Sequence, residues 1–198
     1  MNDVEYWDLC AEKGLRQGML WDNFKKRRMI NNFLSNYDFT DRKILEIGTG
    51  FGVTAAILRL SYGGFHYTGI DISPHFTQIA NDMFKHKMKV GSISAIPAED
   101  NTAEDIFLFD VLEHIDPVQR ATAYKELNRV ITDDGRVFMN YPCDIEESGH
   151  SRDFEFGFSD RDFFDFIEAM QLKLFQFQKY VLNVNGFVNH YNFTVLGK

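Results

Sequence analysis

The sequence predicts a doubly wound α/β fold whose mostly parallel sheet ends in an antiparallel hairpin. Three observations predict it. From residue 43 onward, short apolar runs alternate with segments whose apolar residues recur at helical spacing. A glycine-rich turn follows the first apolar run. The last two runs, residues 172–181 and 187–196, have no helical segment between them and should pair around the NVNG turn at 183–186.

The other predicted strands are short and apolar. They span residues 43–47, 67–71, 88–91, 106–109 and 136–141. The run at 106–109 is apolar throughout, as expected for a central strand that is buried on both faces.

The helices between the strands begin at recognisable start signals. Ser73 and Asp116 each precede a proline and can cap a helix. Ser159 and Asp162 match a capping box in which Asp replaces the usual Glu. The helix after Asp116 should continue through Ile131 and stop at residues 133–135.

The length of 198 residues fits a single domain over 1–198, with a helical cap at 1–40 and an α/β core at 41–198. Within the cap, Asp22 should begin a helix that runs to about residue 36. Hydrophobic residues make up 44% of the chain and charged residues 25%, which is typical of a folded globular protein.

The same composition indicates where the protein acts. No run reaches the roughly 18 apolar residues of a membrane span. The N-terminus lacks the apolar segment of a secretory signal, and the two cysteines are far apart. We therefore expect a cytoplasmic protein without membrane contact. The net charge of −8 argues against a general nucleic-acid surface, and the basic run at 25–28 is typical of a solvated helix face.

The stretch ILEIGTGFG at 44–52 predicts a nucleotide-binding loop, because helix N-termini present free N–H groups to a ligand. Gly52 arrives one residue earlier than in the dinucleotide fingerprint. Asp71 ends the next strand, where a carboxylate can accept both hydroxyls of a ribose. Glu46 would repel a pyrophosphate but suits a ligand with an ammonium and a sulfonium. Alternatively, Glu46 caps a neighbouring backbone or pairs with an Arg.

Three motifs in order, ILEIGTGFG, YTGIDIS and FDVLEHI, resemble the class I S-adenosylmethionine-dependent methyltransferases. The similarity is greatest to the small-molecule branch with a VLEHV-type motif, and it covers roughly residues 43–142. It implies a Rossmann-like, seven-stranded sheet, methyltransferase activity and S-adenosylmethionine as the cofactor.

Carried over by position, the resemblance implies a set of cofactor-binding residues. Glu46 and the loop would line the methionine part of the cofactor, Asp71 the ribose and Ile72 the adenine. Ser92 stands where the family usually has an Asp for the adenine amino group, so the backbone of Ile93 could read adenine instead. The implied set is Glu46, Gly48, Thr49, Gly50, Gly52, Asp71, Ile72, Ser92, Ile93 and, near the sulfonium, Asp110.

The catalytic candidate is His114, which follows the fourth strand of the core. A general base is needed when an alcohol or phenol accepts the methyl group. His114 could instead hydrogen-bond its own loop. Together with Asp110, Glu113 and His150 it also resembles the metal set of RNA 3′-end 2′-O-methyltransferases, but the acidic balance argues against that alternative and we predict no metal.

The acceptor pocket should come from the N-terminal helices and the polar segment at 144–158. The candidate substrate contacts are Tyr6, Trp7, Trp21, Tyr141, His150 and Arg152. Ordinary packing of the aromatic residues, and a loop without a catalytic role, remain alternatives. We expect the methyl group to be transferred to an oxygen or nitrogen atom of a small-molecule acceptor. We also expect no nucleic-acid partner, and a monomer or homodimer. A non-catalytic cofactor-binding module stays open, whereas a nicotinamide oxidoreductase fits Glu46 and Gly52 poorly.

Overall fold

The computed structural model describes residues 2–16, 19–85, 88–143, 156–184 and 187–198. The chain divides into two compact units, residues 1–92 (unit 1) and 93–198 (unit 2), and each is described by itself. The expectation of one domain with an N-terminal cap stays a prediction.

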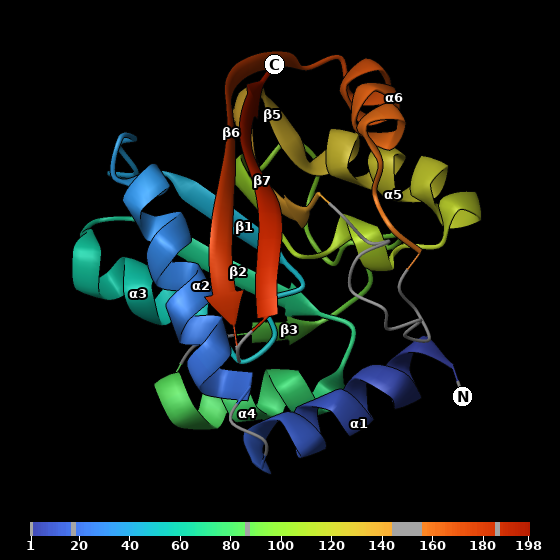
Figure 1. Ribbon diagram of the computed structural model, residues 1–198. Coiled ribbons are helices and arrows are strands. Elements are labelled where there is room, and N and C mark those ends of the chain that lie inside the picture. The colour runs from blue at the N-terminus through green and yellow to red at the C-terminus, as the bar shows by residue number, and fades with distance from the viewer. Residues whose placement is uncertain (1, 17–18, 86–87, 144–155, 185–186) are drawn as a thin grey trace. The chain divides into compact units, whose positions relative to one another are not determined.

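Unit 1 holds the glycine loop and the helices around it (Figure 1). Its strands are parallel, with β1 paired to β2 and β2 to β3. In chain order its elements are α1 (Asp3–Arg16), α2 (Met19–Leu34), β1 (Lys43–Ile47), α3 (Val53–Ser61), β2 (His66–Asp71), α4 (Pro74–Phe84) and β3 (Met88–Val90).

Local capping explains where α4 begins and corrects one prediction about α2. Ser73 caps α4 as predicted, because its hydroxyl accepts a hydrogen bond from the Phe76 N–H at 3.1 Å. Asp22 does not cap a helix, and that prediction was wrong: α2 already begins at Met19. Asp22 lies in the first turn, where an acid interacts well with the helix dipole, and it pairs with Lys25 at 3.4 Å.

Unit 2 holds the hairpin that the sequence predicts. Strand β4 pairs parallel with β5, β5 pairs antiparallel with β7, and β7 pairs antiparallel with β6. The turn residues 185–186 lie outside the described residues. In chain order the elements are β4 (Ala103–Phe109), the 3₁₀ turn η1 (Leu112–His114), α5 (Pro117–Val130), β5 (Ile131–Pro142), α6 (Asp160–Met170), β6 (Lys173–Val184) and β7 (Phe187–Gly197).

Aromatic packing fills the core of unit 2. Phe107, Phe109 and Phe138 are fully buried, and the Phe107 ring lies 5.0 Å from Phe109 and 5.2 Å from Phe138. Burial of the β4 run on both faces is therefore confirmed.

The capping box of α6 is present, since Ser159 and Asp162 exchange side-chain and backbone hydrogen bonds.

The boundary between α5 and β5 differs from the prediction. The helix ends at Val130, and Ile131 is the first residue of β5, where it pairs with Ala103. The prediction that Ile131 is helical was wrong because strand pairing to a distant segment determines its conformation. The register between β4 and β5 then shifts, so that Asp105 pairs with Arg136.

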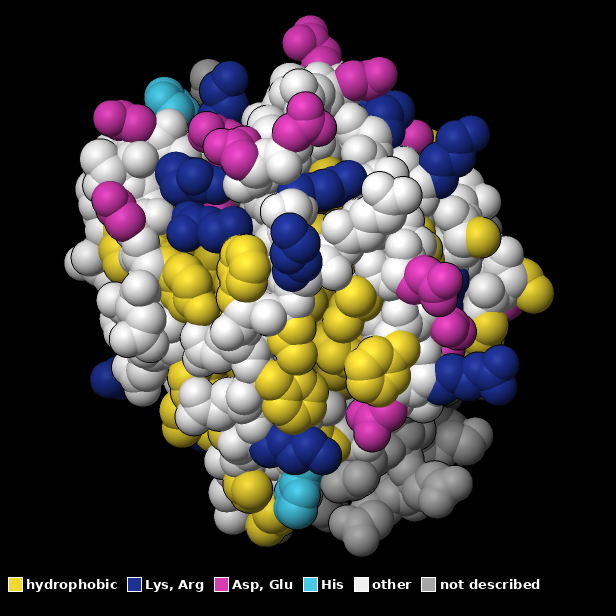
Figure 2. Space-filling model, turned by 90° about the horizontal axis from the view of Figure 1, so that it is seen from above, with side chains coloured by type: hydrophobic (Ala, Val, Ile, Leu, Met, Phe, Trp, Pro, Cys, Tyr) yellow, Lys and Arg dark blue, Asp and Glu magenta, His cyan; other side chains and the backbone are white. Residues whose placement is uncertain are grey.

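Some hydrophobic side chains remain at the surface. Figure 2 shows them gathered in the middle of one face, with charged side chains around them. In unit 2 many belong to β6: Leu174, Phe175, Phe177 and Val181 are exposed. The Phe175 ring lies so close to Gly197 that a Cβ there would be 2.4 Å from the ring, so a larger residue at this position would require the ring to move.

The strand order is β3-β2-β1-β4-β5-β7-β6, mostly parallel with antiparallel C-terminal strands. The predicted seven-stranded α/β fold is confirmed. Among the described residues, no helix is both long and apolar enough to cross a membrane.

Candidate cofactor site

The glycine loop between β1 and α3 turns through the left-handed region of backbone conformation. Gly48, Gly50 and Gly52 have φ values of 70°, 52° and 75°. Other residue types are strained at such angles. At Gly50 an added Cβ would meet nothing within 4 Å, so here glycine serves the turn and leaves open space beside it. The loop is anchored to β2, because the N–H groups of Gly48 and Thr49 donate to the Ile70 carbonyl at 2.8 and 3.1 Å.

Asp71 connects the end of β2 to this loop. Its Oδ2 accepts a hydrogen bond from the Gly50 N–H at 2.8 Å, and its Oδ1 accepts one from the Ser73 N–H at 2.9 Å. Burial raises the pKa of Asp71 to about 6, against the lowering effect of these two N–H groups. Each carboxylate oxygen can accept a further hydrogen bond. The structure thus brings together two predicted site residues, Gly50 and Asp71.

Glu46 is fully buried behind the loop. The Thr54 hydroxyl donates to its Oε1 at 2.7 Å, and the Tyr67 hydroxyl donates to its Oε2. Burial raises the pKa of Glu46 to about 7, although the charge of Arg27 acts in the opposite direction. Glu46 therefore ties β1 to the first turn of α3 and to β2. Its assignment to the methionine part of the cofactor stays a prediction.

Glu46 should make the stability of the protein depend on pH. Because the folded state keeps a proton on Glu46 to higher pH than the unfolded state does, the free energy of unfolding should fall as the pH rises from 4.5 to about 7. The fall attributable to Glu46 is on the order of 3 kcal/mol. Urea unfolding at about pH 5 and about pH 8 measures it.

The variant Glu46→Gln isolates this contribution, since glutamine keeps the hydrogen-bonding shape but does not titrate. We expect a much smaller difference between the two pH values in Glu46→Gln than in the wild type. The control is Glu168→Gln at an exposed position on α6, which should behave as the wild type. An unchanged pH dependence in Glu46→Gln would contradict the account.

Helix α1 contacts the loop side of unit 1. Trp7 packs on a cluster that includes the loop residue Phe51 and the α4 residue Phe76. Asp8 accepts hydrogen bonds from the Ser73 hydroxyl at 2.5 Å and from the His75 N–H at 3.2 Å. These contacts place α1 beside the start of α4, two residues beyond Asp71. Helix α1 thus lies next to Asp71, the residue predicted to bind the ribose.

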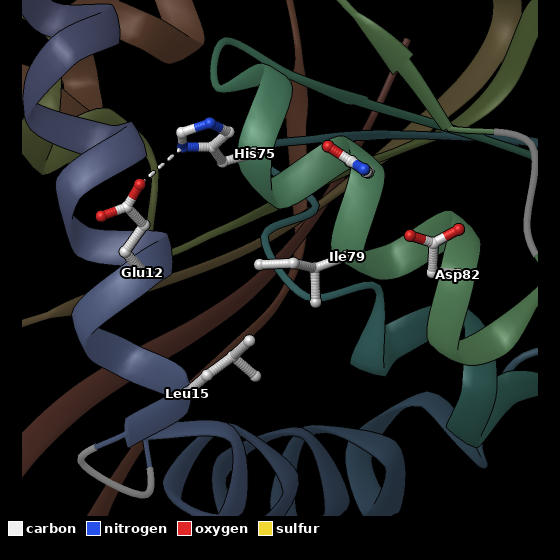
Figure 3. A pocket seen from close by; sticks show the side chains of 6 residues that line it. Glu12, Leu15, His75, Ile79 and Asp82 are labelled. Carbon is white, nitrogen blue, oxygen red and sulfur yellow. Dashed lines mark ion pairs between the residues drawn. The ribbon is translucent and has the colours of Figure 1, made fainter.

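A cleft of about 430 Å³ lies between α1 and α4 (Figure 3). Glu12 and His75 point toward one another across it, with Oε1 and Nδ1 3.7 Å apart. Leu15, Ile79, Gln78 and Asp82 complete the lining. None of the predicted cofactor-binding residues lines this cleft, and we do not assign the cofactor to it.

In unit 2, Asp110 and His114 follow the buried strand β4. Asp110 has a positive φ of 59°, and its Oδ1 accepts a hydrogen bond from the Asn140 amide at 2.9 Å. His114 lies in η1 with its side chain 22% exposed, and its Nε2 is 3.9 Å from Oε1 of the nearly buried Glu113. The strand therefore presents a carboxylate and an imidazole four residues apart at its carboxyl end.

The described residues contain no group of three or more His, Cys, Asp or Glu side chains that could hold a metal ion. Two residues of the sequence-based sets, His150 and Arg152, lie outside the described residues, as does most of the segment 144–158. The alternative metal set that includes His150 is therefore not tested.

The remaining predicted site residues lie in varied surroundings. Ile72 and Ser92 are partly exposed, whereas Ile93 is buried and Thr49 turns inward to the Met88 sulfur at 3.7 Å. Ser92 lies near the end of β2, because the N–H of Gly91 donates to the Asp71 carbonyl at 2.9 Å. These assignments stay predictions.

The acceptor-side aromatic residues also differ from one another. Tyr6 is partly exposed and packs edge-on against Trp7 at 5.0 Å. Trp21 is 71% exposed, whereas Tyr141 is buried against Phe158 at 5.1 Å. Their role in acceptor binding is untested.

Sequence reasoning missed several residues that organise the site. Thr54 and Tyr67 hold Glu46, and Asp8 joins α1 to α4. In unit 2, Arg120 is buried, forms an ion pair with Asp162 in the first turn of α6 at 2.5 Å and donates a hydrogen bond to the carbonyl of Gly157, which precedes that helix. Neither Asp8 nor Thr54 carries a signal of its own in the sequence, because each has its partner in another element: Ser73 lies 65 residues from Asp8, and Glu46 lies 8 residues from Thr54.

The described residues of unit 1 fit the group that the resemblance implies, S-adenosylmethionine. Open space borders the left-handed turn at Gly50, and the Asp71 carboxylate beside it has free acceptor capacity for ribose hydroxyls.

Comparison with known proteins agrees with this fit. Residues 45–139 match the sequence model of the methyltransferase domain family. An uncharacterized methyltransferase of Staphylococcus carnosus (strain TM300) is 24% identical over 161 residues, which are 81% of this chain and 73% of the relative.

Solved structures share the fold. A putative methyltransferase in complex with the Haloferax volcanii methyltransferase activator Trm112 matches with a TM-score of 0.79 and 15% identity, over 96% of each chain. The geranyl diphosphate C-methyltransferase of Streptomyces coelicolor A3(2), in complex with Mg²⁺, geranyl diphosphate and S-adenosyl-L-homocysteine, matches with a TM-score of 0.65 and 12% identity, over 84% of this chain and 78% of that one. Residues 45–139, which include both the glycine loop and Asp71, carry a methyltransferase domain, and the chain has the class I fold of S-adenosylmethionine-dependent methyltransferases, with S-adenosylmethionine as its cofactor.

Proposed function

We propose that this enzyme transfers a methyl group to an oxygen or nitrogen atom of a small-molecule acceptor. The observation that carries the proposal is the hydrogen bond from the Gly50 N–H to the Asp71 carboxylate, which holds the glycine loop and the proposed ribose-binding residue in one arrangement. The bound cofactor supplies an electrophilic methyl group on a sulfonium. The protein has to bind it, orient the acceptor and exclude water.

Each part of the cofactor has a proposed contact. The loop residues Gly48 to Gly52 and Glu46 hold the methionine part, and Asp71 accepts the ribose hydroxyls. Ile72, Ser92 and Ile93 serve adenine. Asp110 follows β4 at the carboxyl end, where ligands bind in α/β sheets, and serves the region of the sulfonium.

His114 is the proposed general base for an acceptor that carries a proton. Its partly exposed imidazole can take that proton, and the neighbouring Glu113 carboxylate stabilises the imidazolium that forms. Tyr6 and Trp7 on α1 are the proposed acceptor contacts nearest the loop, because Trp7 packs beside Phe51. Trp21, Tyr141, His150 and Arg152 complete the proposed acceptor set.

Two observations favour a small acceptor over a nucleic acid. The net charge of −8 disfavours binding to a polyanion. The Streptomyces coelicolor methyltransferase, which shares the fold of this chain, is in complex with a small molecule, geranyl diphosphate. A cytoplasmic monomer or homodimer belongs to the same proposal. Lys173 and Lys179 on β6 oppose edge-to-edge strand pairing, whereas the Haloferax volcanii neighbour shows that a protein of this fold can bind an activator.

Labelling with methyl-tritiated S-adenosylmethionine tests the proposal. Purified protein is incubated with the low-molecular-weight fraction, and separately with the RNA, of an extract from its own organism. We expect label to enter the low-molecular-weight fraction, equally with and without a chelator. A matched reaction with Gly50→Val should incorporate none, because valine at a φ of 52° distorts the loop.

Other outcomes would overturn the proposal. Label in RNA that disappears with the chelator supports the RNA-end methyltransferase. Cofactor binding without label in either fraction supports the non-catalytic module.

A further inference from the structure

Asn140, on β5, contacts Asp110 with both its backbone and its side chain. The Asp110 N–H donates to the Asn140 carbonyl at 2.8 Å, and the Asn140 amide Nδ2 donates to the Asp110 Oδ1 at 2.9 Å. Asn140 is 1% exposed, so its amide cannot use water instead. Asp110 itself has a positive φ of 59°, in the left-handed region of backbone conformation.

Tyr180, on β6, holds the other end of the same amide. Its hydroxyl donates to the Asn140 Oδ1 at 2.6 Å. The Tyr180 ring is stacked on Tyr191 of β7, with centroids 5.4 Å apart and planes 23° apart, and the two residues are paired in the strand register. The ring is therefore fixed, and its hydroxyl reaches Asn140 from the outermost strand.

The chemistry of the three groups gives this chain of hydrogen bonds a single direction. A carboxylate only accepts, so Asp110 requires the NH₂ end of the Asn140 amide. The carbonyl end then faces Tyr180, whose hydroxyl can donate. A hydrogen bond at the carbonyl polarises the amide and strengthens its N–H donor. Without the Tyr180 hydroxyl, the buried carbonyl loses its partner and the amide loses the contact that opposes its rotation.

We propose that Tyr180 and Asn140 are positioning residues that fix the direction of the Asp110 carboxylate. This inference rests on the proposed function, in which Asp110 serves the sulfonium region of the cofactor. It gives the C-terminal hairpin a functional role: β6 contributes the hydroxyl that orients a site residue on β4.

Tyr180→Phe tests the inference with the least change, because it removes one hydroxyl and keeps the stacked ring. Calorimetric titration with S-adenosylhomocysteine should show binding about fivefold weaker than in the wild type, because the Asp110 carboxylate is no longer held in one direction. The matched control is Tyr124→Phe. Tyr124 is also largely buried in unit 2, and its hydroxyl makes no hydrogen bond to the described part of the chain, so its removal should leave affinity unchanged.

A double-mutant cycle separates positioning from a general structural effect. Against an Asp110→Asn background, Tyr180→Phe should have no further effect on affinity, because the carboxylate that it orients is gone. An equal fivefold loss in both backgrounds would overturn the inference, as would wild-type affinity in Tyr180→Phe.

The side-chain amide signals of Asn140 in the NMR spectrum of the ligand-free protein give a second measurement. In the wild type these protons should exchange slowly with solvent, and in Tyr180→Phe faster. If the wild type binds no cofactor, the proposed function fails, and these signals still decide whether the hydrogen-bond chain exists. If cofactor binds but Tyr180→Phe leaves the amide signals unchanged, the positioning role alone is wrong.

Discussion

Replacing His114 with glutamine is expected to lower kcat about 1000-fold at neutral pH with an alcohol or phenol acceptor. Glutamine preserves hydrogen-bonding groups of similar size but cannot take up a proton. The affinity for S-adenosylhomocysteine should stay unchanged, because the proposed role of His114 concerns the acceptor. Initial rates over a range of acceptor concentrations, together with calorimetric titration, provide both quantities.

The pH dependence identifies the reason for the loss. As the pH rises, more of the acceptor is already deprotonated, so the deficit of His114→Gln should shrink. The control is His66→Gln at an exposed position at the start of β2, which should keep wild-type rates. If His114 only hydrogen-bonds its own loop, the variant should instead lose stability and show a rate deficit that does not vary with pH.

Replacing Arg136 with methionine is expected to lower the free energy of unfolding by about 3–5 kcal/mol. Arg136 binds Asp105 through two hydrogen bonds, Nε to Oδ1 at 2.7 Å and Nη2 to Oδ2 at 2.9 Å. The Asp105 side chain is 0% exposed, whereas that of Arg136 is 19% exposed. Methionine fills a similar volume but leaves a buried carboxylate without its cation. Urea unfolding monitored by circular dichroism measures the change.

Two further variants make this result interpretable. Lys25→Met breaks the exposed pair with Asp22, in which Lys25 is 61% exposed, and should cost less than about 1 kcal/mol. The double variant Arg136→Met with Asp105→Leu removes both charges and should recover most of the lost stability. A double variant as unstable as Arg136→Met would show that packing, and not the unpaired charge, causes the loss.

The sequence predicted the elements whose signals are local. Ser73 with Pro74, and Ser159 with Asp162, mark helix starts through contacts within four residues, and both helices begin there. The start of β4 was missed because a charged residue such as Asp105 is not expected in a buried strand. The burial of Asp105 is explained only by its pairing with Arg136, 31 residues away. The helical prediction for Ile131 failed for the same kind of reason, since pairing with Ala103 overrides the local pattern.

The candidate site shows a similar division. The glycine loop and Asp71 were predictable because their residue types carry the chemistry, and the hydrogen bond between Gly50 and Asp71 joins them. The partners of Glu46 were not predictable: Thr54 and Tyr67 come from different elements and are ordinary core residues by type. The link from Tyr180 to Asp110 was invisible for the same reason, as it spans three strands.

The most direct test of the central claim is calorimetric titration of the wild-type protein with S-adenosylhomocysteine, alongside Asp71→Asn and alongside NAD⁺. Asp71 accepts hydrogen bonds from the N–H groups of Gly50 and Ser73, one at each carboxylate oxygen. Asparagine at position 71 would place an NH₂ group opposite one of these N–H groups, and that hydrogen bond would be lost. We predict one-to-one binding of S-adenosylhomocysteine by the wild type, much weaker binding by Asp71→Asn, and no binding of NAD⁺. Folded wild-type protein that binds no S-adenosylhomocysteine, or that prefers NAD⁺, would contradict the account.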